Sequence, residues 1–71
     1  MSYFGFVRVK KNFALDIYYW LIDNGFVADY PLALSPSLSE IFLSDVTPDQ
    51  RTLCFDYLSS VYGVVPDLYL L

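Results

Sequence analysis

Residues 3–25, YFGFVRVKKNFALDIYYWLIDNG, change their hydrophobic period part-way along. From Tyr3 to Lys10, aromatic and β-branched residues alternate with others, which predicts a strand with Arg8 and Lys10 facing water. Beyond it, apolar residues recur at the three- and four-residue spacing of an amphipathic helix. A strand followed at once by such a helix predicts a small α+β domain.

This helix is expected over residues 13–24. Asn12 is a residue type that caps helix N-termini, and Gly25 fits the left-handed position just past the C-terminus. At about 100° per residue, one broad apolar face forms. It contains Ala14, Ile17, Tyr18, Leu21 and Ile22.

The middle of the chain predicts a connection and then a short helix. Two prolines make residues 26–36 a connecting segment. Ser37 and Glu40 have the spacing of a capping box, in which the two side chains satisfy each other's backbone donors. The pattern predicts a short helix through Leu43, with these residues inward: Leu38, Ile41 and Phe42.

The last third predicts a second main helix and a terminal strand. Thr47 and Gln50 form another capping box, and Pro48 suits the first helical position. This helix is expected to end near Tyr62, before Gly63. Residues 68–71 are expected to form a strand that pairs with the first one, and an all-α fold with extended ends is the alternative. The inward face of the helix is Leu53, Cys54, Tyr57, Leu58 and Val61.

Length and composition limit what this chain can be. Its 71 residues support one small domain, residues 1–71. One cysteine cannot form an internal disulfide, and without histidine a four-ligand zinc site is not expected. No cofactor is expected either. Aromatic residues make up 20% of the chain, and tyrosine and tryptophan are typical of protein interfaces.

Charge is unevenly distributed. The net charge is −4, yet residues 1–11 carry three cations and no acid, while the remainder carries eight acids and only one cation, Arg51. Nucleic-acid binding needs an extended cationic face, so we expect no direct nucleic-acid partner. The charge favours a larger protein with a basic surface as the partner, or no charged partner at all. We expect no membrane-spanning segment. We also expect a cytoplasmic protein in which Cys54 is reduced.

The chain lacks catalytic equipment. Histidine is the commonest general base, and none is present. Three scattered glycines cannot form a phosphate-binding loop. Carboxylates seven residues apart on a helix are separated by about 10 Å and are expected to be solvated. We therefore expect no enzyme.

One acidic and aromatic stripe is the candidate site. Two carboxylates share one face of the first helix, flanked by a tyrosine and a tryptophan, which is the pattern of a protein-docking surface. Two acids of the last helix extend it if the helices lie side by side. In the alternative, Trp20 folds against the N-terminal strand and the acids are simply solvated. The predicted protein-binding residues are Asp16, Tyr19, Trp20, Asp23, Asp49 and Asp56.

Three functional classes fit these observations. The first is a protein-binding module that inhibits or adapts a larger protein, a role typical of stand-alone phage- or plasmid-encoded factors of this size. The second is an acidic nucleic-acid mimic that occupies a basic groove. The third is an obligate small subunit or homodimer whose exposed rings are covered by its own partner.

Overall fold

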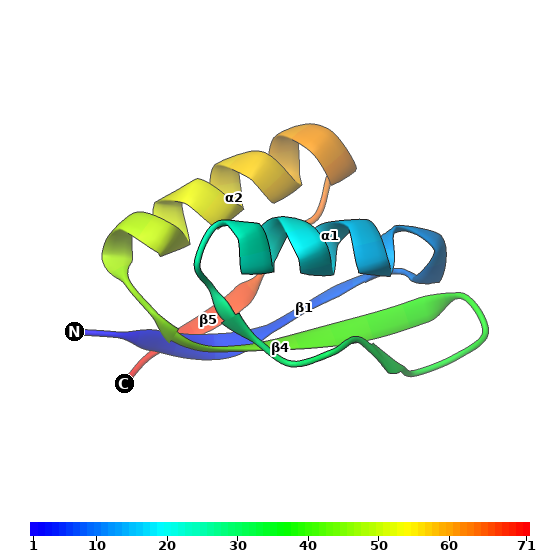
Figure 1. The fold of residues 1–71 in the computed structure, drawn as a ribbon, viewed down its shortest axis with the longest axis horizontal. Coiled ribbons are helices and arrows are strands. Elements are labelled where there is room, and N and C mark those ends of the chain that lie inside the picture. Colours follow the sequence, from blue (N-terminus) through cyan, green and yellow to red (C-terminus); the bar gives the residue numbers. More distant parts are fainter.

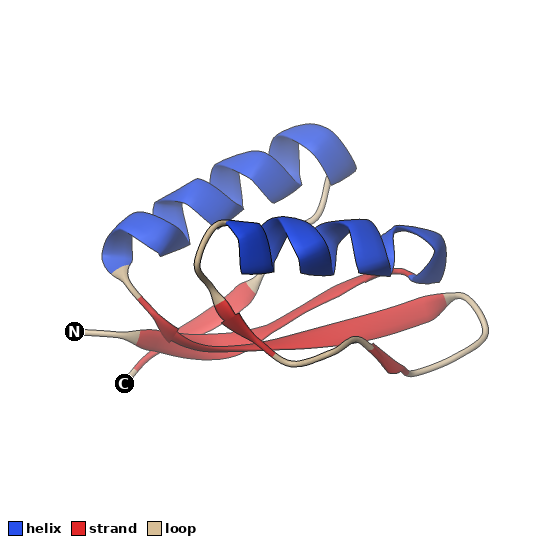
Figure 2. Ribbon diagram, in the orientation of Figure 1, coloured by secondary structure: helices blue, strands red, loops and turns tan.

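Two helices lie on one face of a five-stranded antiparallel sheet in the computed structural model, which describes residues 1–71 (Figure 1). The opposite face of the sheet carries no helix (Figure 2). The elements, in chain order, are β1 (Tyr3–Lys10), α1 (Lys11–Asp23), β2 (Val27–Ala28), β3 (Leu32–Ala33), β4 (Leu38–Val46), α2 (Pro48–Tyr62) and β5 (Asp67–Leu70).

The sheet has the order β2-β4-β1-β5, and β3 also pairs with β4. All of these pairings are antiparallel. If β2 and β3 are taken as one interrupted strand, the connectivity is the β-α-β-β-α-β arrangement, in which each helix crosses over the same face. The α+β prediction is confirmed. So is the terminal strand, because β5 pairs with β1 from Tyr3 opposite Leu70 to Phe6 opposite Asp67.

The short helix predicted between Ser37 and Leu43 is wrong. Those residues belong to β4, a nine-residue strand that pairs with β1 on one side and with β2 and β3 on the other. Pairing along both edges outweighs a local capping pattern, since a capping box contributes only about 1 kcal/mol. Glu40 does not cap a helix. Its carboxylate accepts a hydrogen bond from Arg8 Nε at 2.8 Å across the sheet.

The predicted helix ends are partly confirmed. Asn12 is not a cap, because α1 begins at Lys11 and Asn12 lies inside the helix. The Lys11 N–H donates to the Ser37 carbonyl at 3.0 Å. Gly25 has the expected positive φ of 78°. The Thr47 capping box of α2 is present: the Gln50 N–H donates to Thr47 Oγ1 at 3.1 Å, and the Thr47 N–H donates to Gln50 Oε1 at 3.0 Å.

The core lies between the helices and the sheet. Alternate residues of the two central strands meet a narrow stripe from each helix, and Ile17, Leu21, Ile41 and Leu58 are fully buried there. Four residues expected to face inward are instead exposed: Ile22, Phe42, Leu53 and Val61. Each helix packs against the sheet along one of its own sides only. Fewer of its residues are therefore buried than its apolar sequence pattern predicts. Phe42 is exposed because β4 directs it to the face without helices.

Gly5 allows the close approach of β1 and β5. A Cβ at this position would overlap the carbonyl oxygen of Asp67, a backbone atom that cannot rotate away. Glycine within a strand often marks such close backbone contact. Gly5 therefore lets the C-terminal strand complete the sheet.

Candidate functional site

The two helices lie side by side and run antiparallel. Phe13, near the start of α1, contacts Tyr62 at the end of α2, with ring centroids 5.4 Å apart. At the other end, Gln50 Nε2 donates a hydrogen bond to the Gly25 carbonyl at 3.1 Å. Because the helices lie side by side, the acids of both can belong to one surface.

Trp20 packs against α2. Its ring is stacked on that of Tyr57, with centroids 4.0 Å apart and planes within 3°, and Phe26 lies 5.9 Å away. The side chain is partly buried and borders the hydrophobic core. Trp20 is therefore not free on the solvent face, and the ring on which it stacks belongs to α2. Trp20 and Tyr57 form a rigid aromatic pair that joins the helices.

Four carboxylates lie exposed on the helices near this aromatic pair. They are Asp16 and Asp23 on α1 and Asp49 and Asp56 on α2. Helical geometry turns each of them outward from the stacked rings, at an angular offset of about 40–100°. None is paired with a cation, since the sole ion pair of the molecule joins Arg8 and Glu40 in the sheet. We call these four carboxylates, with Trp20 and Tyr57 between them, the acidic helix face.

Tyr62 lies at one end of this face. Desolvation is the main cause that raises the pKa of its phenol, and the neighbouring Tyr57 and Asp16 raise it further. Asp16 belongs to α1, so this smallest contribution comes from the neighbouring helix.

Tyr19 is 56% exposed and lies about 100° around α1 from Trp20. It contacts Tyr18 edge-to-face at 5.5 Å, and Tyr18 contacts Tyr30 in the same way at 5.4 Å. The structure therefore separates Tyr19 from the stacked pair, and it borders the acidic helix face only on its outer side.

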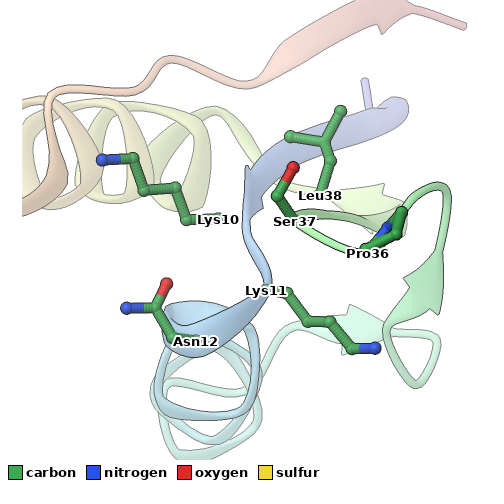
Figure 3. A pocket seen from close by; sticks show the side chains of 6 residues that line it. All are labelled: Lys10, Lys11, Asn12, Pro36, Ser37 and Leu38. Atoms are coloured by element: carbon green, nitrogen blue, oxygen red, sulfur yellow. The ribbon is translucent and has the colours of Figure 1, made fainter.

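A hollow of about 640 Å³ lies where β1 passes into α1 (Figure 3). Lys10 and Lys11 line it, yet Figure 3 shows their side chains pointing in different directions. The N–H of Lys11 is already bonded to the Ser37 carbonyl, which also removes a helix-terminal donor from the hollow. The hollow has no convergent set of groups that would hold an anion.

Other chemistry has little support in the side chains. No three histidine, cysteine or acidic residues gather in a group that could hold a metal ion. Cys54 is fully buried, and burial raises the pKa of its thiol to about 11, so it is a poor nucleophile at neutral pH. Neither helix is long and apolar enough to cross a membrane.

The face of the sheet opposite the helices is a second surface, which the sequence reasoning missed. Phe4 and Phe6 of β1, Phe42 of β4 and Tyr69 of β5 all point to it, because they occupy alternate positions opposite the buried ones. The rings meet in pairs, Phe4 with Tyr69 at 5.9 Å and Phe6 with Phe42 at 6.3 Å. The alternation in residues 3–10 contains the signal, but the segment that supplies Phe42 has the local spacing of a helix start.

Comparison with known proteins does not assign a function. No protein-family model, no curated protein and no solved structure matches this chain. Its function must therefore be argued from the two surfaces themselves.

Proposed function

We propose that this protein is a non-enzymatic binding module that inhibits or adapts a larger protein, with its acidic helix face docked on a basic surface. One observation carries the proposal: the two helices joined by a stacked aromatic pair expose four carboxylates, and none of the four forms an ion pair with a cation of the chain. The expected location is the cytoplasm, where Cys54 would stay reduced.

The rigidity of the face supports a role in binding. Stacking on Tyr57 fixes the ring of Trp20, and the Gln50 bond to Gly25 holds the helix ends together. A side chain that is already fixed loses little rotamer freedom when a partner binds, which leaves more of the contact energy for affinity. Tryptophan and tyrosine are also common among the residues that dominate interface energies.

The unpaired acids support a basic partner. Carboxylates that meet lysine or arginine across an interface speed the encounter and exclude acidic competitors. Such a partner supplies the cations that this chain lacks on its helices.

A nucleic-acid mimic is less well supported. Double-stranded DNA carries about one charge per 1.7 Å of its axis. On each helix of this protein the acids are about 10 Å apart, which is much sparser. Docking that combines aromatic contact with charge fits this spacing better than imitation of a phosphate backbone.

Capture from the native host tests this proposal. The tagged wild-type chain, an Asp16→Asn/Asp23→Asn variant and an Asp29→Asn control are exposed to the same lysate, and bound proteins are quantified by mass spectrometry. Asp29 is exposed but lies in the loop after β2. The proposal predicts a basic protein retained by the wild type and the control and depleted on the double variant. Equal recovery on all three would contradict it.

The salt dependence of binding distinguishes a docking module from a nucleic-acid mimic. Docking that depends on rings and a few charges should weaken modestly between low and physiological ionic strength. A steep decline would favour the nucleic-acid mimic, because salt screens an interaction that depends on exposed charges alone.

A further inference from the structure

The open sheet face is an apolar surface without a cover. Besides its four aromatic rings, Val27 of β2 and Leu32 of β3 lie opposite Ser44 and Glu40 and so point the same way. Phe42 is 43% exposed and Tyr69 is 55% exposed, although both sit within regular strands. Both helices cover the other side of the sheet (Figure 2). We call the residues Phe4, Phe6, Val27, Leu32, Phe42 and Tyr69 the open sheet face.

The area of this face is near what a dimer needs. A whole aromatic side chain buries about 150–250 Å², so the exposed parts of these six residues amount to roughly 500 Å². The polar rim around them, formed by Arg8, Lys10 and Asp67, increases the total. A standard interface covers about 800 Å² per partner, and a typical monomer leaves no apolar patch larger than about 300–600 Å². The open sheet face is at the upper end of what a monomer exposes.

Its charge distinguishes between the possible occupants. Arg8 and Lys10 balance Glu40 and Asp67, so the face is close to neutral. The guanidinium of Arg8 is held by Glu40 at 2.8 Å and also lies 5.0 Å from the Phe6 ring centroid. Only Lys10 remains free for a phosphate, which is too little for a nucleic-acid strand stacked on the rings. The acidic helix face, in contrast, would repel a copy of itself.

We propose that a second copy of this chain covers the open sheet face. Two such faces pack against each other about a two-fold axis, with the sheets about 10 Å apart. A neutral, aromatic surface is suited to self-association because like charges do not meet in its centre. The resulting dimer directs both acidic helix faces outward, so the inference does not depend on the identity of any partner.

Sedimentation equilibrium of the purified full chain tests this proposal. The wild type should have twice the monomer mass of 8.2 kDa at micromolar concentration. Phe42→Lys places an ammonium in the centre of the face and should weaken dimerisation by about thirtyfold or more. Leu15→Lys is the matched control, because Leu15 is 44% exposed on the outer side of α1 and gains the same charge. This variant should remain a dimer.

A second sheet variant and a nucleic-acid probe test the alternatives to a dimer. Tyr69→Lys on β5 repeats the test if circular dichroism shows that Phe42→Lys has unfolded. A wild-type monomer throughout the micromolar range would overturn the proposal, as would dimers that persist in both sheet variants. A fluorescein-labelled oligouridine serves as the probe for the other occupant. Binding of this strand by a monomeric protein, lost in Phe42→Lys, would assign the face to nucleic acid instead.

Discussion

Replacing Trp20 by alanine tests how the two helices are held together. Trp20 is partly buried, and its ring is stacked 4.0 Å from that of Tyr57. Truncation therefore removes apolar packing between α1 and α2 together with a well-aligned aromatic contact. Tyr19→Ala is the matched control on the same helix, because Tyr19 is exposed and is absent from the stacked pair.

The magnitude follows from the degree of burial. Truncating a fully buried tryptophan costs about 3–5 kcal/mol, and a partly buried one loses a smaller share of this. The stack itself contributes about 0.5–1.5 kcal/mol beyond its buried area. We expect Trp20→Ala to lower the free energy of unfolding by about 2–3 kcal/mol, out of about 4–10 kcal/mol for a chain of this length. The control should change it by less than about 0.5 kcal/mol.

Thermal melts followed by circular dichroism measure this difference. For a domain of this size, each 1 kcal/mol shifts Tm by about 4–8 °C, so Trp20→Ala should melt about 10–20 °C lower and remain folded at room temperature. A double-mutant cycle with Tyr57→Ala should give a coupling of about 1 kcal/mol between the two rings. A Tm unchanged within a few degrees, or a coupling of zero, would refute the stacked arrangement.

Three further perturbations test other parts of the fold. Thr47→Ala removes the side-chain acceptor of the α2 capping box and should cost about 1 kcal/mol, measured by urea denaturation. Gly5→Ala drives a methyl group into the Asp67 carbonyl and should lower the free energy of unfolding by about 2–4 kcal/mol. Relative to the wild type, hydrogen exchange should accelerate more in β5 than in β4. Above pH 9, the thiol of Cys54 ionises in the unfolded chain and stays protonated in the folded one, because burial raises its pKa from 9.0 to about 11. The free energy of unfolding should therefore fall by about 2 kcal/mol more in the wild type than in Cys54→Ala between pH 9 and pH 11, in paired denaturation series, and equal losses would contradict this.

Local signals in the sequence identified the elements whose stability depends on neighbours in the chain. The Thr47 capping box and the left-handed Gly25 and Gly63 are such cases, because each is satisfied within a few residues. The first strand was also predictable, since its alternation extends over the whole of residues 3–10. These signals were sufficient for the α+β class.

The position of β4 could not be read from local signals. Ser37 and Glu40 have helix-start spacing, and only pairing with β1, more than thirty residues away in the chain for Arg8 and Glu40, makes this segment a strand. The error also concealed the open sheet face, because Phe42 was assigned to the interior.

The sequence predicts which acids of the candidate site are exposed better than it predicts how the aromatic rings are arranged. The acids of α1 and α2 are exposed as expected, and the helices are side by side. The stack of Trp20 on Tyr57 was not foreseen, because each ring was assigned from the period of its own helix. Which flank faces the neighbouring helix depends on how the two helices cross the sheet, and this is a property of the tertiary fold.

The association rate of the captured partner is the most direct test of the claim that the acidic helix face is the docking surface. It is measured at low salt for the wild type, Asp23→Lys on the helices and Phe42→Lys on the sheet. We predict that Asp23→Lys slows association by about tenfold, through loss of electrostatic steering, and that Phe42→Lys leaves the rate per chain unchanged. An unchanged rate for Asp23→Lys, with a slower one for Phe42→Lys, would contradict the account and assign the partner to the sheet.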